Sequence, residues 1–259
     1  MSTRALLWLM PALAMFVWVA TLTAAQSESV PADANRASVG KTGMILAVSW
    51  QPAFCETRPN KRECASQTAA RPDATQFSLH GLWMMRKTYC GIGEDIQALD
   101  KSGDWHALPH VALPPELENA LALSMPGTQS ALDRHEWVKH GTCSGLTAAE
   151  YYALSMRLLG ELNASAVGEL FADNVGNSLE EQAIRGAFEA SFGPGAGDRV
   201  KMQCRRDGQR RIIIELTIGL AGEPTDALTL EGGLGPLIKE AGATKFGCPG
   251  GIVDAVGTQ

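Results

Sequence analysis

The sequence has no Cys-x-x-Cys pair and only five histidines among its 259 residues. The missing pair argues against zinc-ribbon and thioredoxin-like proteins, because both depend on closely spaced thiols. Positive charge is also scarce, and the formal net charge is −6. An acidic chain is unsuited to coating nucleic acid, because non-specific affinity comes from neutralising many phosphates. An enzyme that touches one or two phosphates remains compatible with this composition.

A long apolar run occurs only at the N-terminus. Residues 5–19 are apolar, follow the single charge of Arg4, and precede small residues that end at Ala25. This is the layout of a secretory signal peptide, which we predict over residues 1–25. An uncleaved membrane anchor, which needs about 20 apolar residues, is the alternative, but Pro11 interrupts the run. We therefore expect a secreted or periplasmic monomer that has no membrane contact once the signal is removed.

The chain after this segment carries all six cysteines. An even number in an exported chain suggests three disulfides, although the residues themselves leave about fifteen pairings open. Residues 26–43 are polar and are predicted to be a flexible N-terminal segment. Residues 44–259 show no internal repeat or linker and are long enough for one catalytic domain with a substantial core. The cysteines are Cys55, Cys64, Cys90, Cys143, Cys204 and Cys248.

Two β-capable runs lie in the first half of this domain. Met44–Trp50 is apolar, and Gln76–Trp83 alternates apolar and polar residues, so both are predicted to be strands. Between them, Gln51–Ala74 is rich in proline, arginine and asparagine and is interpreted as a loop closed by a short disulfide. Gly91–Pro114 is interpreted as a second long loop.

Helices and a hairpin are predicted in the rest of the chain. Thr147 and Glu150 form a capping-box pattern, and Ser178 and Glu181 repeat it before another helix. Asp207–Gly208 is a strong hairpin turn between two further strands. The expected fold is α+β, a central antiparallel sheet with several helices, stabilised by disulfides. The predicted helices cover Pro115–Ser124, Ala131–His140, Thr147–Leu162 and a segment that ends near Phe192.

The stretch HEWVKHGTC combines two histidines, a glutamate, a lysine and a cysteine. A zincin motif places its histidines four residues apart, about 40° from each other around a helix. Here His135 and His140 are five residues apart and diverge by roughly 140°. We therefore expect neither a metal nor another cofactor, and a zinc hydrolase is the weakest alternative.

On a regular helix the ionisable residues of this stretch share one broad face, while Trp137 and Val138 point toward the core. A solvated amphipathic helix would show the same pattern. It would not explain why two of the five histidines occur within six residues. The residues on this face are His135, Glu136, Lys139 and His140.

A third histidine, His80, lies on a predicted strand in FSLHGLW. A lone strand histidine is usually a packing residue, but Gly81 permits close backbone approach and Trp83 offers a flat surface for a base or for the core. Two histidines on different elements can supply a general acid and a general base. RNA cleavage by the ribose 2′-OH requires such a pair and no metal, and DNA would not be a substrate.

Two segments, FSLHGLW (Phe77–Trp83) and HEWVKHGTC (His135–Cys143), resemble the active-site segments of the ribonuclease T2 family of secreted endoribonucleases. SWQPAFC (Ser49–Cys55) resembles the first strand and loop of that family. The resemblance extends to FADNVGNSLEE and the hairpin near Cys204, so it spans most of the chain after the signal.

This resemblance implies roles for five residues. His80 would protonate the leaving 5′-oxygen, and His140 would remove the proton of the 2′-OH. Glu136 and Lys139 would stabilise the pentacovalent phosphorane, and His135 would bind the phosphate. The products would be 2′,3′-cyclic phosphate ends, hydrolysed more slowly to 3′-phosphates.

The resemblance also implies a base site and a disulfide pattern. Trp83 would stack on a base, and Tyr89 is a further candidate for this site. The family commonly has proline where Met84 stands, which affects base preference rather than catalysis. The implied disulfides are Cys55–Cys64, Cys90–Cys143 and Cys204–Cys248.

Other polar residues match neither motif. His106 and His110 are interpreted as loop histidines. Four arginines at the predicted hairpin either guide RNA or protect an edge strand from aggregation. The alternative to an enzyme is an exported protein of the same fold that acts by binding a partner. The four arginines are Arg205, Arg206, Arg210 and Arg211.

Overall fold

The computed structural model describes Met1 and residues 40–229 and 233–257. The predicted signal peptide, beyond Met1, and most of the predicted N-terminal segment therefore lie outside the described residues. Within the described residues, every helix is too short or too polar to cross a membrane.

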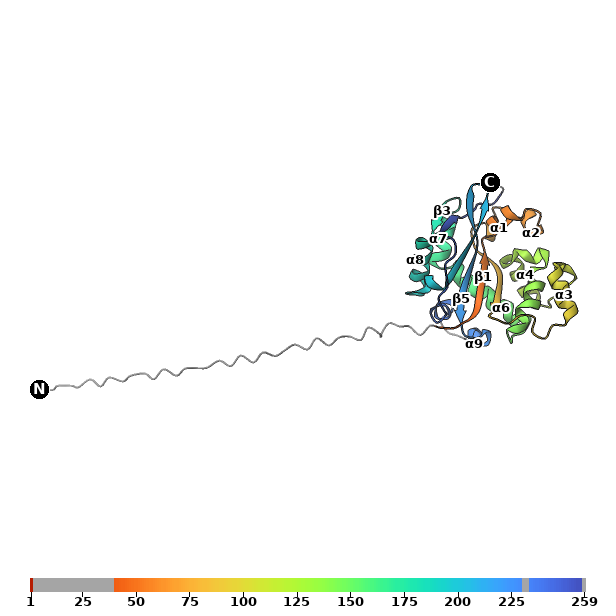
Figure 1. Ribbon diagram of the computed structural model, residues 1–259, viewed down its shortest axis with the longest axis horizontal. Helices are drawn as coiled ribbons and strands as arrows, with labels where there is room; N and C mark the ends of the chain where they lie inside the picture. Colours follow the sequence, from red (N-terminus) through yellow and green to blue (C-terminus); the bar gives the residue numbers. More distant parts are fainter. Residues whose placement is uncertain (2–39, 230–232, 258–259) are drawn as a thin grey trace. The chain divides into compact units, whose positions relative to one another are not determined.

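A six-stranded sheet forms the centre of the domain, with strand order β2-β1-β5-β6-β3 and with β4 paired to β5 (Figure 1). The ladders that join β2, β1, β5 and β4 are antiparallel, as predicted, and β6 also pairs antiparallel with β3. The sheet is nevertheless mixed, because β6 runs parallel to β5. The strands are β1 (Thr42–Ser49), β2 (Ser78–Met84), β3 (Ser178–Glu180), β4 (Val200–Asp207), β5 (Arg210–Ala221) and β6 (Gly250–Ile252).

The two faces of this sheet differ in character. Met44, Leu46 and Val48 alternate along β1, and all three are completely buried in the hydrophobic core. The opposite face carries Ile45 and Ser49, and the partner of Ser49 across the ladder is Glu215. Ser49 and Glu215 thus place polar side chains side by side on the face opposite Met44, Leu46 and Val48.

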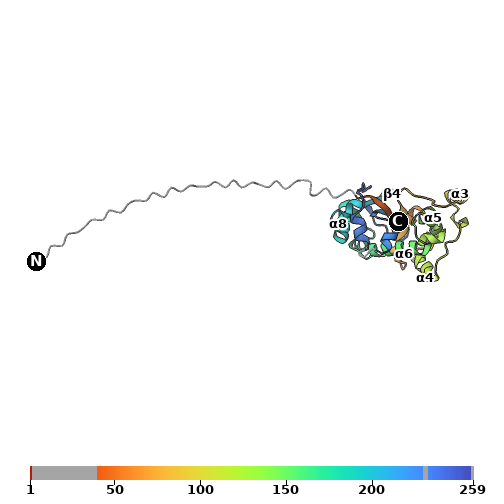
Figure 2. The ribbon, with the colours of Figure 1, turned by 90° about the horizontal axis from the view of Figure 1, so that it is seen from below.

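Helices cover the core face. Helix α6 packs on β1 and β2, and α10 packs on β5. In both ribbon views, α8 lies on the opposite side of the strands from α3 and α4 (Figures 1 and 2). The helices are α1 (Gln51–Thr57), α2 (Arg62–Ala65), α3 (Glu94–Ser102), α4 (Pro115–Ser124), α5 (Leu132–Lys139), α6 (Ala148–Asn163), α7 (Ala166–Asp173), α8 (Glu181–Phe192), α9 (Pro224–Thr229) and α10 (Leu234–Lys239).

The predicted start of α6 is confirmed. The Thr147 side chain accepts a hydrogen bond from the backbone N–H of Glu150, and the Glu150 carboxylate accepts one from the backbone N–H of Thr147. The second predicted capping box is wrong. Ser178 belongs to β3, which pairs with β6 and buries Leu179, and α8 begins at Glu181 without a side-chain cap.

Both predicted loops contain helices. Residues 51–74 form α1, α2 and a 3₁₀ turn, and Pro52 fits the first turn of α1 because its missing N–H is not needed there. Residues 91–114 contain α3, which begins with Glu94 and Asp95 and ends at Gly103 in a left-handed conformation. Acidic residues in the first turn and a glycine just after the last turn are common helix boundary signals, and the prediction of a loop did not take them into account.

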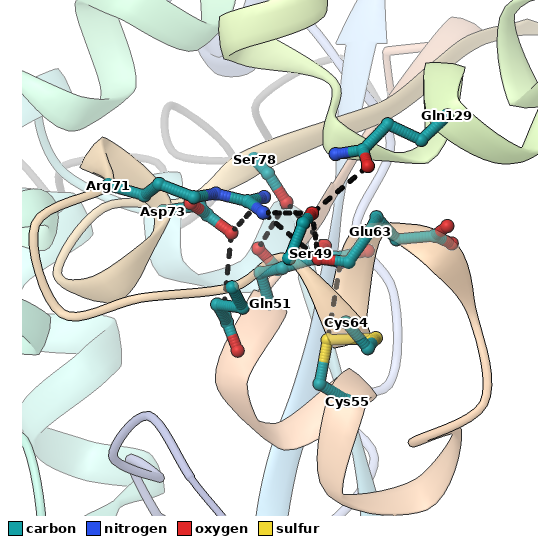
Figure 3. Close-up of polar contacts among 11 residues, drawn as sticks. Ser49, Gln51, Cys55, Glu63, Cys64, Arg71, Asp73, Ser78 and Gln129 are labelled. Carbon is teal, nitrogen blue, oxygen red and sulfur yellow. Dashed lines mark hydrogen bonds and ion pairs between the residues drawn. A yellow bond between two sulfur atoms is a disulfide. The ribbon is translucent and has the colours of Figure 1, made fainter.

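A polar network around Arg71 holds the α1–α2 segment rigid (Figure 3). The guanidinium forms two hydrogen bonds of 2.9 Å with Asp73 and also donates to the carbonyl of Glu63 and the hydroxyl of Ser66. Ser78, at the start of β2, donates to Gln51 on α1. The α1–α2 segment is therefore held in place at the edge of the sheet where β1 ends and β2 begins.

The three disulfides of the structure are those that the resemblance implied: Cys55–Cys64, Cys90–Cys143 and Cys204–Cys248.

Candidate active site

His80 lies on β2, on the sheet face that does not contact the core. Its Nδ1 donates a hydrogen bond of 2.6 Å to Oε2 of Glu215 on β5. Gln203 on β4 donates to the other oxygen of this carboxylate. Sequence reasoning missed both partners. The signal for Glu215 was present, since a single carboxylate in the apolar run RIIIELTI is costly to bury without a partner.

These partners determine the charge of His80. Burial lowers the pKa of the imidazole, but the hydrogen bond to Glu215 and the negative charges of Glu136 and Glu215 outweigh burial. The net pKa lies above the ordinary value of 6.5. His80 is thus charged in the lower neutral range, and its Nε2 lies 3.6 Å from Oε1 of Glu136.

Glu136, on α5, lies between two imidazoles. Its Oε1 is 3.8 Å from Nε2 of His135 as well as close to His80, and its Oε2 accepts a 2.8 Å hydrogen bond from the indole N–H of Trp83. Burial raises the pKa of Glu136 to about 7, against the lowering effects of His80, the Trp83 hydrogen bond and Lys139. A solvated helix face does not describe this carboxylate, which is only 1% exposed.

Gly81 is the residue that lets Glu136 approach the sheet. A Cβ at position 81 would lie 2.0 Å from Oε2 of Glu136 and 2.9 Å from the indole nitrogen of Trp83. Glycine is required here for close approach and not for an unusual backbone conformation.

His140 lies one residue beyond α5, which ends at Lys139. Its ring centroid is 5.7 Å from that of Trp83, and the edge of His80 contacts the same indole at 5.2 Å. Burial, together with the charge of Lys139, lowers the pKa of His140 to about 3. Its buried Nδ1 has no hydrogen-bond partner among the described residues. His140 is therefore neutral at any ordinary pH.

His135 is held by a second carboxylate that sequence reasoning missed. Its Nδ1 donates a 2.7 Å hydrogen bond to Asp100 on α3, and the Trp105 ring stacks on the imidazole at a centroid distance of 4.2 Å. Burial lowers the pKa of His135 despite Asp100. Asp100 and Trp105 escaped notice because their segment was interpreted as a loop.

Tyr89 belongs to the same group. Its hydroxyl donates to Asp100 at 2.7 Å, and its backbone N–H donates to the carbonyl of Lys139. Its neighbour Cys90 is bonded to Cys143, three residues after His140. Tyr89 and this disulfide thus connect α3 to the end of α5. A role of Tyr89 in base binding remains a prediction.

Lys139 completes the site. Its positive charge lowers the pKa of all four of its ionisable neighbours in the cluster, namely His80, His135, Glu136 and His140. Of the other residues around α5, Val138 is buried as predicted, and Trp137 is half-buried against the core. Over residues 40–229 and 233–257, no group of three histidine, cysteine or acidic side chains has an arrangement that could hold a metal ion.

Two pockets are lined in part by residues of this cluster. One, of about 450 Å³, is lined by His80 and Glu215 together with Leu79, Trp105, Arg58 and Arg205. The other, of about 430 Å³, is lined by Trp83, Ile45, Lys201 and Thr217. His106 and His110 are exposed and lie outside both pockets, in agreement with their interpretation as loop residues.

The model of the ribonuclease T2 family matches residues 42–229, which is most of the chain. The chain belongs to the ribonuclease T2 family. Both segments on which the resemblance rested, and all the residues of the cluster described above, lie within this range.

Named relatives agree with this membership. Ribonuclease I of Escherichia coli (strain K12) is 31% identical over 207 residues, which is 71% of this chain and 76% of that protein. Intracellular ribonuclease LX of Solanum lycopersicum is 29% identical over 168 residues, 62% of this chain and 64% of that protein. The crystal structure of the SF11-RNase of Nicotiana alata has 16% identity and a TM-score of 0.47, covering 71% of this chain and 88% of that chain.

Proposed function

We propose that this protein is a metal-independent endoribonuclease that cleaves single-stranded RNA through attack of the ribose 2′-OH. The observation that carries the proposal is the contact of two imidazoles, whose pKa values are shifted in opposite directions by their surroundings, with one indole. His80 has a raised pKa and His140 has a pKa lowered to about 3, and both rings lie against Trp83. Membership of the ribonuclease T2 family supports RNA as the substrate.

The two histidines have complementary roles in this reaction. The neutral His140 accepts the proton of the 2′-OH as its oxygen attacks phosphorus. The charged His80 donates its Nε2 proton to the departing 5′-oxygen. The first products are a 2′,3′-cyclic phosphate and a 5′-OH, and water later opens the ring to a 3′-phosphate with the roles of the histidines exchanged.

The remaining polar residues stabilise the charged phosphorane. Lys139 supplies a fixed positive charge, and His135 supplies an N–H from a ring that Asp100 orients. Glu136, whose pKa is about 7, can carry a proton in the acid range and donate a hydrogen bond to a phosphorane oxygen. Because DNA lacks the 2′-OH nucleophile, it is not cleaved.

The positions of His80 and Trp83 in different pockets support one orientation of the RNA strand, with its 3′ side toward His80 and its 5′ side toward Trp83. The pocket of 450 Å³ contains His80 but neither His140 nor Trp83. Because His80 protonates the leaving oxygen, the nucleoside on the 3′ side of the cut occupies this pocket. The base on the 5′ side then stacks on Trp83, which lines the second pocket.

We further infer that the protein acts outside the reducing cytosol, after removal of residues 1–25, as a monomeric domain over residues 44–259. All six cysteines are paired in the structure, and disulfides persist mainly in secreted and periplasmic proteins.

A single assay tests the function. The oxidised protein is incubated in EDTA with a short RNA and with DNA of the same sequence, and the new ends are identified by mass spectrometry. We expect RNA with 2′,3′-cyclic phosphate ends and intact DNA, and cleavage slower by about 10²-fold or more with the His140→Ala variant. Intact RNA from pH 4 to 8, with a folded protein, would favour the alternative of a binding protein, and loss of activity in EDTA would favour a metal-dependent hydrolase.

A further inference from the structure

His80 and Glu215 form a pair that the roles taken from the ribonuclease T2 resemblance leave unused. Their contact of 2.6 Å joins β2 to β5, 135 residues apart in the sequence. Glu215 is only 9% exposed, although it lies in a strand whose neighbours are apolar. Burying a carboxylate is costly unless a partner compensates for the lost hydration.

We propose that Glu215 is a positioning residue for His80, holding its Nδ1–H so that Nε2 carries the proton for the leaving 5′-oxygen. The proposal rests on the proposed function, because only a reaction with a departing oxygen gives Nε2 a proton acceptor. It assigns to β5 a part in a reaction whose proposed acid, base and phosphate-binding groups come from β2, from α5 and from the residue after α5.

The geometry of the imidazole supports this role. A histidine ring has two nitrogens, and a hydrogen bond at one of them fixes both the ring rotation and the position of the remaining proton. With Nδ1 held by Glu215, Nε2 faces Glu136 at 3.6 Å, in the centre of the cluster. A rotated ring would turn this proton away from the reacting phosphate.

Glu215 is itself fixed on both sides. Its strand position pairs with Ser49 of β1 and with Gln203 of β4, and the Gln203 amide donates to the carboxylate oxygen that does not contact His80. A side chain in the middle of an antiparallel sheet, with both oxygens bonded, has little freedom to move. The carboxylate therefore transmits the rigidity of the sheet to the imidazole.

The proton balance requires no transfer to Glu215. In the first step the Nε2–H bond of His80 breaks and the leaving oxygen gains that proton. His80 becomes neutral and keeps its Nδ1–H bonded to the carboxylate, which stays ionised. When water opens the cyclic phosphate, Nε2 takes a proton from the attacking water, and the charged imidazole is restored.

A purely structural ion pair would make a different prediction from a positioning pair. If Glu215 stabilised the fold without acting on the His80 ring, its neutral replacement would lower stability and leave the pH dependence of the remaining activity unchanged. If it positions and charges His80, the replacement leaves burial and Lys139 to lower the pKa of His80 with less opposition. The alkaline limb of the kcat profile then moves to lower pH.

The test compares Glu215→Gln, Glu215→Asp and the matched control Glu223→Gln, an exposed glutamate that pairs with Lys87. For each variant, kcat and KM are measured on a dinucleotide from pH 4 to 9, and the His80 ring is titrated by NMR. We expect Glu215→Gln to shift the alkaline limb and the His80 titration down by about one pH unit or more, because a carboxylate in contact raises a histidine pKa by that amount. On the alkaline limb, at a pH above both pKa values, its kcat falls about tenfold or more, with KM within about twofold, since a pKa shift of one unit changes the charged fraction there by a factor of ten.

Glu215→Asp keeps the negative charge, so its alkaline limb and His80 titration should shift less than those of Glu215→Gln. Glu223→Gln should match the wild type. Unchanged pH profile and His80 titration in Glu215→Gln would overturn the proposal. Should that variant fail to fold, Glu215→Asp decides, because wild-type behaviour with a shortened side chain would exclude positioning. The NMR titration needs no RNA cleavage, so a wild-type protein without activity would refute the proposed function while the link between Glu215 and His80 is still measured.

Discussion

The candidate site has a sheet side and a helix side, and each holds its histidine differently. On the sheet side, comprising His80, Gln203 and Glu215, a chain of hydrogen bonds crosses three strands and fixes one ring nitrogen. On the helix side, comprising Lys139 and His140, the buried Nδ1 of the histidine has no hydrogen-bond partner among the described residues, and a cation is its sequence neighbour.

This difference shows that the surroundings, and not the residue type, assign the chemistry. A carboxylate keeps one imidazole protonated, whereas burial and a lysine keep the other neutral. In the proposed reaction, two copies of the same side chain can thereby serve as an acid and a base at one pH.

The largest expected effect is the loss of activity when the histidine of either side is replaced. His80→Ala and His140→Ala should each lower kcat on a dinucleotide by about 10²–10⁴-fold, the usual contribution of a general acid or base. A uridine 3′-phosphodiester with 4-nitrophenol as leaving group needs no general acid. We expect this substrate to restore activity to His80→Ala and not to His140→Ala, measured by release of nitrophenolate. Equal rescue of both variants would contradict the assignment of acid to the sheet side.

The pH profile of the wild type sharpens the same comparison. His140 must be neutral, so kcat should fall only as pH drops through its pKa of about 3. His80 must be charged, so kcat should also fall as pH rises through its pKa, which lies above 6.5. Beyond either limb the loss is about tenfold per pH unit. Initial rates on a dinucleotide, with folding monitored by circular dichroism, test this. An optimum above pH 8 would exclude the assignment.

A disulfide fixes the chain next to the helix side. Removing it should lower the stability and the activity more than removing a disulfide farther from His140. Cys90–Cys143 closes 53 residues and lies next to His140, whereas Cys55–Cys64 closes 9 residues. Replacing Cys90 and Cys143 by serine should lower the free energy of unfolding by about 2–4 kcal/mol and reduce kcat several-fold. The matched double variant at Cys55 and Cys64 should lose less of both in urea unfolding and rate measurements. A larger loss of activity in the latter would show that the tie near His140 is dispensable.

The smallest effect concerns the pocket on the sheet side. Arg205 lines this pocket, whereas its neighbour Arg206 does not, because successive strand residues face opposite sides. Arg205→Gln should lower kcat/KM on RNA about two- to fivefold at low salt and reduce the slope against log salt by about 0.7, the loss of one phosphate contact to a single strand. Arg206→Gln is the control. Equal effects of the two variants would mean that the hairpin attracts RNA without a defined path.

Sequence reasoning identified the residues that we propose to react, and it missed most of the residues that form hydrogen bonds with them. His80, Glu136 and His140 occur in short motifs whose chemistry can be recognised locally. Their partners come from distant elements: Glu215 lies 135 residues after His80, and only the register of β1, β2 and β5 brings the two together. Asp100 was hidden by the interpretation of its segment as a loop.

The errors in the fold have similar causes. Ser178 and Glu181 fit a capping box, but the burial of Leu179 and the pairing of β3 with β6 outweigh a cap worth about 1 kcal/mol. The strand predicted from the apolar run Met44–Trp50 and the Asp207–Gly208 turn were predicted correctly because both signals are local, and the structure contains β1 and the β4–β5 hairpin.

Gly81 has a consequence for the evolution of this sequence. Its Cα–H faces the Glu136 carboxylate and the Trp83 indole so closely that a methyl group has no room. A library of variants selected for activity should therefore contain glycine at position 81 in nearly every survivor. Any survivor with alanine there should carry a shorter residue at position 136, such as aspartate, which withdraws the carboxylate from position 81. Two positions on different elements are in this way constrained to change together.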